Sequence, residues 1–186
     1  LSVVNRLYRF EFEKQNLDDS KILGLNLGNV LKDKKNNDLP TKTKLNLLHE
    51  IKNFPLELSE IVYDLKQIYT NEFFSTRCFP DFSIDYLFRK LRENNIRTAV
   101  ASNSIAATVN QAMVNLDIQK YIEFSLSNED VNEPKPSSEI YLKAIEMLDL
   151  LPSECLIIED NINGITAAKA SGAFCLEVKE VEDVNQ

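Results

Sequence analysis

The sequence predicts an α/β fold, in which an all-helical region precedes a parallel sheet with helical crossovers. Two patterns support this prediction: apolar residues recur at intervals of three and four up to about Thr76, and short apolar strands alternate with helices after Pro80. The 186 residues are 44% hydrophobic and 27% charged, a composition typical of a globular chain that buries a sizeable core.

The helical region contains one strongly amphipathic segment. In LELSEIVYDLKQIYTNEFF (56–74), apolar side chains follow the i, i+3, i+4, i+7 spacing of a helix. A less regular helix is expected over 2–14. Between these segments, LKDKKNNDLPTKTK (31–44) is polar and rich in lysine, so we expect a loop whose charged side chains are solvated.

The second region alternates strands and helices, which implies parallel strands joined by crossover helices. The boundary is expected near 77–82, so that residues 1–78 form a helical domain and residues 79–186 an α/β domain. In chain order, helices are expected over 83–94, 105–115, 138–150 and 165–171, and strands over 97–101, 123–127, 155–158 and 173–178.

Charge and cysteine content narrow the classes of partner. The net charge of −8 and the isoelectric point near 4.8 disfavour nucleic acid and anionic membranes. The start, LSVVNRLYRF, has the pattern of neither a signal peptide nor a membrane span. The cysteines are odd in number and form no Cys-x-x-Cys, so we expect a reducing, cytoplasmic compartment and no zinc. A monomer or weak dimer is expected.

Polar side chains follow three of the predicted strands, and ligands of open parallel sheets bind at that edge. The first strand ends at Ser102-Asn103-Ser104, where a hydroxyl and backbone N–H groups suit a phosphate, although a plain helix cap explains these residues as well. Lys135 lies between Pro134 and Pro136, which restrict the backbone on both sides. Its ammonium suits a phosphate, and the alternative is a surface lysine in a turn.

The third strand ends at the acid pair Glu159-Asp160. Adjacent carboxylates repel each other unless a positive group lies nearby, and Mg²⁺ is the natural candidate. The alternative is that Asp160 or Asn161 caps a helix beginning near Gly164, with Glu159 solvated. Taken together, a hydroxyl, an ammonium and an acid pair at successive strand ends form a set that can hold a phosphoryl group beside a metal ion.

These segments resemble the motifs of the haloacid dehalogenase superfamily, in the branch of β-phosphoglucomutase and the phosphoglycolate and sugar-phosphate phosphatases. TAVASNS (98–104) is similar to the second motif, EPKPSSEIYLKA (133–144) to the third and CLIIEDNINGITAAKASG (155–172) to the fourth. The resemblance implies a Rossmann-like core with helices on both faces, an all-α cap and a Mg²⁺ cofactor. ILGLNLGNVL (22–31) resembles the cap segment that contacts the substrate.

The resemblance also implies roles for the residues at the strand ends. Ser102 and Asn103 would bind the phosphoryl group, and Lys135 would hold the same group and screen the nucleophile. Glu159 and Asp160 would bind Mg²⁺, with Asp160 counted among the catalytic residues. Capping of the next helix would then fall to Asn161 or Asn163.

The family's first motif, an Asp-x-Asp that supplies the nucleophile and the general acid/base, does not occur in this sequence. Asp81 and Asp85 do not form it, because they open a predicted helix. In the family, the strand that carries this motif lies between the strand ending at Ser102 and the strand ending at Glu159. Without the motif strand, those two strands would carry unpaired backbone groups. We therefore expect a functional protein with a segment before Leu1, and with a further element after residue 186.

Three functions fit this set of motifs. The first is a Mg²⁺-dependent phosphatase that acts through an aspartyl-phosphate on a small metabolite such as a sugar phosphate or phosphoglycolate. The second is a sugar-phosphate mutase assisted by His49, the only histidine, for which a surface or packed position is the simpler role. The third is a non-catalytic phosphate-binding chain, which follows if the protein begins at Leu1.

Overall fold

The computed structural model describes residues 39–178. The helix expected over 2–14 and the cap segment over 22–31 lie outside the described residues. The helices are α4 (Thr41–Lys52), α5 (Leu56–Arg77), α6 (Phe82–Glu93), α7 (Ala106–Asn115), α8 (Glu139–Met147) and α9 (Ile162–Ser171). The strands are β1 (Val100–Ala101), β2 (Ser125–Leu126), β3 (Leu156–Glu159) and β4 (Phe174–Glu177), and two 3₁₀ turns are η1 (Gln119–Tyr121) and η2 (Pro152–Glu154).

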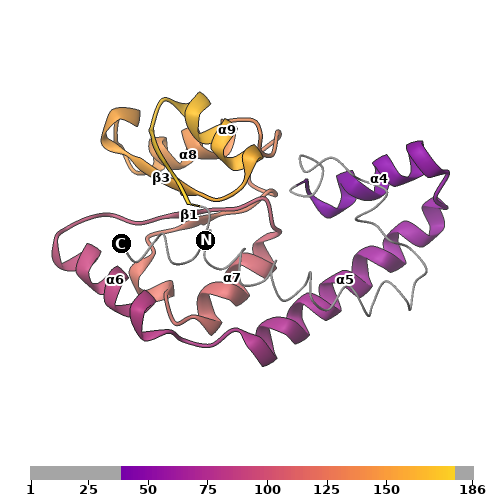
Figure 1. Cartoon of the computed structure of the whole chain (residues 1–186), viewed down its shortest axis with the longest axis horizontal. Coiled ribbons are helices and arrows are strands. Elements are labelled where there is room, and N and C mark those ends of the chain that lie inside the picture. The colour runs from indigo at the N-terminus through magenta and orange to yellow at the C-terminus, as the bar shows by residue number, and fades with distance from the viewer. Residues whose placement is uncertain (1–38, 179–186) are drawn as a thin grey trace.

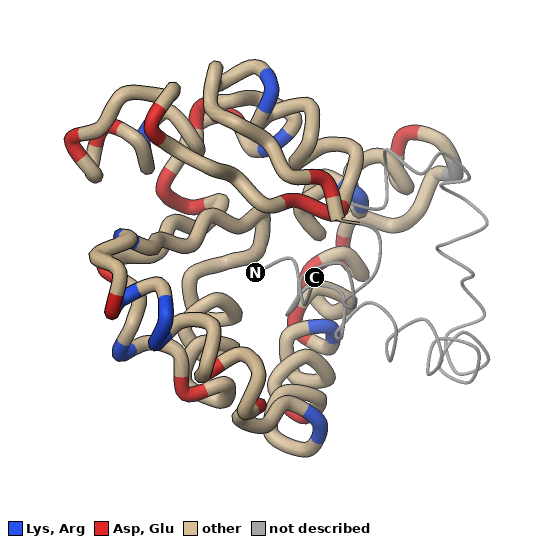
Figure 2. The backbone as a smooth tube through the Cα atoms, turned by 60° about the vertical axis from the view of Figure 1, so that its left-hand side comes forward, with Lys and Arg blue, Asp and Glu red and all other residues tan. Residues whose placement is uncertain are grey.

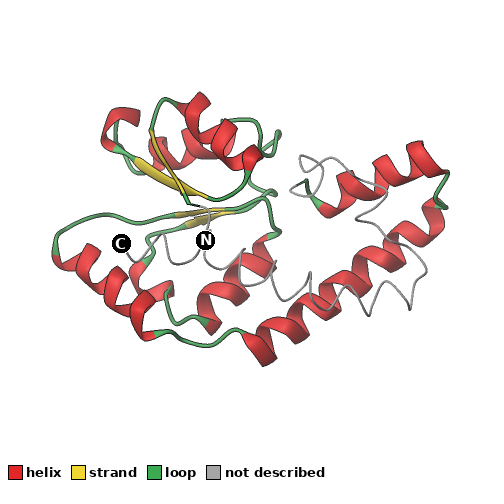
Figure 3. Cartoon of the chain, in the orientation of Figure 1, coloured by secondary structure: helices red, strands yellow, loops and turns green. Residues whose placement is uncertain are grey.

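Helices lie on both sides of the strands, which confirms the predicted α/β class. β1 pairs with β2 and β3 pairs with β4, both in parallel. Figures 1 and 3 show α8 and α9 on one side of the strands and α6 and α7 on the other, with α5 and α4 extending away from them. The parallel pairing follows from the crossover helices between successive strands.

The two strand pairs are separate sheets in the described part of the chain. Within residues 39–178 no strand joins β1 to β3. That the strand of the family's first motif lies between them stays a prediction. One face of the β3–β4 pair is apolar and exposed: Leu156 is 61% exposed and its partner Phe174 is 65% exposed. Ile158 and Leu176, the next pair on that face, are exposed as well.

Three apolar clusters hold the elements together. The first joins the end of α5 to β1 and α7 through Phe74, Val100, Val109, Ala112, Met113, Leu116 and Ile118. The second joins β2 to α8 and α9 through Leu126, Ile140, Tyr141, Ala144, Ala167 and Ala168. The third joins α4 to the start of α5 through Leu45, Leu48 and Phe54.

Helix α4 corrects the prediction of a loop over 31–44, which is wrong from Thr41 onward. Leu45 and Leu48 are almost fully buried against Phe54. This tertiary contact stabilises a helix that the charged sequence does not predict. His49 Nδ1 lies 2.7 Å from the carbonyl oxygen of Phe54 and joins the end of α4 to the turn before α5. The histidine therefore has a packed structural position.

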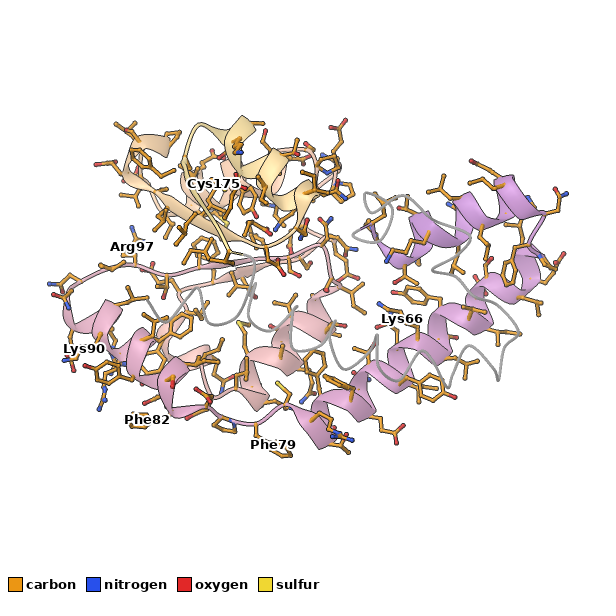
Figure 4. The ribbon with its side chains drawn as sticks, viewed as in Figure 1. Lys66, Phe79, Phe82, Lys90, Arg97 and Cys175 are labelled. Atoms are coloured by element: carbon orange, nitrogen blue, oxygen red, sulfur yellow. The ribbon has the colours of Figure 1, made fainter. Side chains whose placement is uncertain are left out.

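The junction between the helical and α/β regions is fixed by polar contacts. The Asp81 carboxylate accepts from Ser83 N at 2.8 Å and Ile84 N at 3.2 Å, which confirms that it opens α6. Asn115 Nδ2 of α7 donates to the carbonyl oxygen of Phe74 in α5. Phe79 and Phe82 project outward at this junction (Figure 4), where they are 62% and 78% exposed.

Charged residues of both signs are interspersed over the described helices (Figure 2). Surface ion pairs such as Lys90–Glu93 and Lys169–Glu177 join neighbouring side chains. Within residues 39–178, no helix combines the length and apolar character that a membrane span requires.

Candidate active site

The carboxyl ends of β1 and β3 meet at one buried lysine. Lys135 Nζ donates to the carbonyl oxygen of Ala101, the last residue of β1, at 3.1 Å. The same ammonium forms an ion pair with the carboxylate of Glu159, the last residue of β3. Lys135 is 4% exposed and Glu159 is 5% exposed. The structure thus brings together the ammonium and Glu159, the first residue of the acid pair, which the sequence predicted at successive strand ends.

The backbone of Lys135 is clamped by the loop after β1. Lys135 N donates to Asn103 Oδ1 at 3.0 Å, and Asn103 Nδ2 donates to the carbonyl oxygen of Lys135 at 3.2 Å. The side-chain amide of Asn103 thus pairs with both the backbone N–H and the backbone carbonyl of Lys135, as a neighbouring strand would. Asn103 therefore positions Lys135, while its expected contact with a phosphoryl group stays a prediction.

Ser102 lies at the end of β1 and is 1% exposed. Its backbone N–H donates to Leu126 of β2, and its Oγ accepts from Ser104 N at 3.1 Å. It does not cap α7, which follows Ile105. Instead the Glu129 carboxylate, from the loop after β2, accepts from Ala106 N at 2.8 Å. The plain helix-cap interpretation of Ser102–Ser104 is therefore wrong, and the phosphate-binding role stays a prediction.

The loop after β2 is ordered by Asp130. Its carboxylate accepts from the backbone N–H and from the hydroxyl of Ser127, at 2.8 and 2.7 Å. These two bonds hold the pKa of Asp130 below its usual value. Lys143 Nζ of α8 donates to the Asp130 carbonyl oxygen at 2.6 Å. The turn that presents Lys135 is thereby fastened to β2 and to α8.

Both carboxylate oxygens of Glu159, the first residue of the acid pair, have hydrogen-bond partners. Glu159 Oε1 accepts from Lys135 and from the hydroxyl of Tyr141, and Oε2 accepts from Asp160 N and Asn161 Nδ2, both at 3.3 Å. The cap of α9 is Asn161, whose side chain accepts from Gly164 N at 2.7 Å. The positive group that the adjacent carboxylates require is therefore, at Glu159, a lysine.

Two residues at this site were missed by sequence reasoning. Tyr141 is a buried residue of α8. Burial, and then the charge of Glu159, raises the pKa of the Tyr141 hydroxyl, so that hydroxyl remains a donor. Gly164 lies in the first turn of α9, where a Cβ would overlap the carboxylate of Glu159. A glycine inside a helix is the signal that could have indicated such a close approach, because it costs about 1 kcal/mol relative to alanine.

The site suits a divalent cation only in part. Among residues 39–178 no group of three or more His, Cys, Asp or Glu side chains is placed to hold a metal ion. Glu159 is paired with Lys135, and Asp160, the other carboxylate of the pair, is half-buried. That both acids bind Mg²⁺ stays a prediction. Because Mg²⁺ takes one or two carboxylates together with waters and phosphate oxygens, Asp160 fits as one ligand of such a shell.

The sequence matches known proteins over most of its length. Residues 20–178 match the family of haloacid dehalogenase-like hydrolases. A phosphorylated carbohydrates phosphatase of Thermotoga maritima is 29% identical over 82 residues, which are 44% of this chain and 38% of that protein. The putative phosphatase YhcW of Bacillus subtilis is 33% identical over 87 residues, which are 47% of this chain and 40% of that protein.

The fold is shared with a solved structure as well. The β-phosphoglucomutase of Clostridium difficile superimposes with a TM-score of 0.67 at 22% identity, over 82% of this chain and 70% of that one. The chain spans only about two fifths of the length of the two curated relatives named above. The family match covers the predicted second, third and fourth motifs, and it confirms the resemblance on which they were assigned. The chain therefore belongs to the haloacid dehalogenase-like hydrolase family.

Proposed function

We propose that this chain holds the phosphoryl group in a Mg²⁺-dependent phosphohydrolase of small phosphorylated metabolites. The observation that carries the proposal is the buried ammonium of Lys135, which joins the ends of β1 and β3. The family match supports hydrolase chemistry, and the relative from Thermotoga maritima is named a phosphatase of phosphorylated carbohydrates.

We assign Lys135 and Ser102 to the transferred group. An ammonium has three N–H donors, and Ala101 and Glu159 take two of those of Lys135. The third can donate to a phosphoryl oxygen at the ends of the strands. The Ser102 hydroxyl, at the same edge, can donate to a second oxygen. We assign no residue of the 186 as the nucleophile, because the Asp-x-Asp motif does not occur among them.

We assign Asp160 to the cation and Glu159 to Lys135. The single positive charge of Lys135 is already paired with the carboxylate of Glu159. A phosphate monoester is itself an anion and needs further positive charge to bind there. Mg²⁺, when bound, would neutralise the phosphoryl oxygens.

The helical region, taken as residues 1–78, is assigned as a cap over the α/β region of residues 79–186. Its described helices α4 and α5 pack on each other and join the α/β region at α7. We propose that it closes over the site, excludes water and selects the substrate.

The test is binding and turnover measured on the same preparation. Calorimetry with inorganic phosphate, with and without Mg²⁺, reports binding, and release of phosphate from a panel of monoesters reports turnover. Ser102→Ala and Lys135→Met should weaken phosphate binding, whereas Lys169→Met, at an exposed lysine paired with Glu177, should not. Binding without turnover would support the non-catalytic alternative. Absence of both in the presence of Mg²⁺ would overturn the proposed function.

A further inference from the structure

Tyr141 contacts both members of the buried ion pair. Its hydroxyl donates to Glu159 Oε1, the oxygen that also accepts from Lys135. Its ring centroid lies 4.5 Å from Lys135 Nζ, so the ring faces the cation. The side chain projects from α8 and is 5% exposed. A buried tyrosine needs one partner for its hydroxyl, and this one touches the anion and the cation of the same pair.

These contacts restrict how Lys135 can move. The Ala101 carbonyl oxygen and Glu159 Oε1 direct two of its N–H groups, and the Tyr141 ring occupies a third side of the ammonium. Glu159 itself is restricted, because its Oε1 accepts from Tyr141 and its carboxylate lies so close to α9 that a Cβ at Gly164 would overlap it. The direction left for the remaining N–H group of Lys135 is therefore set by Tyr141 together with Glu159.

We propose that Tyr141 is a positioning residue of the phosphate site, which acts through Glu159 to aim the Lys135 ammonium at the bound phosphoryl group. The identity of the ligand rests on the proposed function, whereas the restriction of Lys135 does not. In the absence of the tyrosine hydroxyl, one acceptor position of Glu159 becomes vacant. The carboxylate can then rotate and carry the ammonium with it.

The matched variants are Tyr141→Phe and Tyr121→Phe. Tyr121 has the same kinds of contact at another place in the fold: its hydroxyl donates to Asp85 at 2.7 Å, and Lys120 and Arg92 lie over its ring. Both variants keep the aromatic ring and remove one hydroxyl from a carboxylate. Only the first should alter the site if positioning, and not general packing, is the role of Tyr141.

The first readout is the order of the Lys135 ammonium, measured by NMR relaxation of its nitrogen. We expect the order parameter to fall in Tyr141→Phe and to remain unchanged in Tyr121→Phe. The second readout is the dissociation constant of inorganic phosphate in the presence of Mg²⁺, which should rise about three- to tenfold in Tyr141→Phe alone. In a Lys135→Met background, Tyr141→Phe should have no further effect on that constant.

The outcomes separate the two proposals. Unchanged ammonium order in Tyr141→Phe overturns the positioning role, whatever phosphate does. Equal weakening of phosphate binding by Tyr141→Phe in the presence and absence of Lys135 overturns it as well, because the effect then does not pass through the lysine. Reduced order in a chain whose wild type neither binds phosphate nor releases it from monoesters supports the restriction of Lys135 by Tyr141 and overturns the proposed function.

Discussion

Replacing Gly164 by alanine tests whether Glu159 is held where the structure places it. Helix propensity alone predicts that this change stabilises α9 by up to about 1 kcal/mol, because alanine is the better helix former. The structure predicts the opposite sign. A Cβ at this position would overlap the carboxyl carbon and both carboxylate oxygens of Glu159.

The expected magnitude follows from what the carboxylate must give up. A flexible glutamate would swing aside at little cost, but this one is 5% exposed and is held by Lys135 and Tyr141. Breaking a buried pair costs about 3–5 kcal/mol, because it leaves a charge buried without its partner. The helix cannot easily retreat, since Ala167 and Ala168 are fully buried behind it. After the gain in propensity, we expect Gly164→Ala to lower the free energy of unfolding by about 2–4 kcal/mol.

The assay is urea unfolding followed by circular dichroism, with a second pair of variants as the control. In a Glu159→Ala background the obstacle is absent, so adding Gly164→Ala should raise the unfolding free energy by up to about 1 kcal/mol. The effect of one substitution thus changes sign with the residue at position 159. A Gly164→Ala chain at least as stable as the wild type would refute the reasoning, because it would show that the carboxylate is free to move.

Three further changes have distinct expected outcomes. Burial, and then the charge of Lys44, lowers the pKa of Lys66 from 10.5 to about 8, and Lys66 projects from α5 toward α4 (Figure 4). The unfolded chain therefore keeps this proton to higher pH, so stability should rise with pH between about 8 and 10.5. Lys66→Met should stabilise the chain by about 1–3 kcal/mol at pH 7 and remove that rise, as urea unfolding at several pH values would show. Asn161→Ala should cost about 1 kcal/mol in the same assay through loss of the α9 cap, whereas Asn161→Ser, which keeps a capping oxygen and adds no charge beside Glu159, should cost less. Asp160→Asn should abolish the effect of Mg²⁺ on phosphate binding measured by calorimetry; a retained Mg²⁺ effect would exclude Asp160 as the cation ligand.

The order of strands and helices could be predicted because it depends on local periodicity. The 3.6-residue period of α5 and the apolar run of β3 are visible in sequence. The strand over 97–101 was predicted too long, since β1 is limited to Val100–Ala101. Strand length depends on which neighbour completes the hydrogen-bond ladder, and β1 pairs with β2 alone in the described chain. No local pattern contains that information.

Helix α4 and the cap of α7 could not be predicted for a related reason. Leu45 and Leu48 are two apolar residues in a charged segment, and their helix is stabilised by packing on Phe54. The acceptor for Ala106 N is Glu129, which is 23 residues away in sequence. Sequence proximity favoured Ser102–Ser104 as the cap, whereas the parallel pairing of β1 and β2 brings the loop of Glu129 to the start of α7.

The roles within the acid pair follow from charge, and here sequence reasoning had the right premise but an incomplete set of partners. Two adjacent carboxylates at the end of a strand require a positive group, and the sequence alone pointed to Mg²⁺ as that group. The structure gives Lys135 to Glu159, which is as buried as the lysine itself. The lysine charge is then largely compensated before any ligand arrives. A phosphate that enters this site, as the proposed function requires, would therefore meet little uncompensated positive charge. The more tightly Glu159 holds Lys135, the more phosphate binding should depend on a cation.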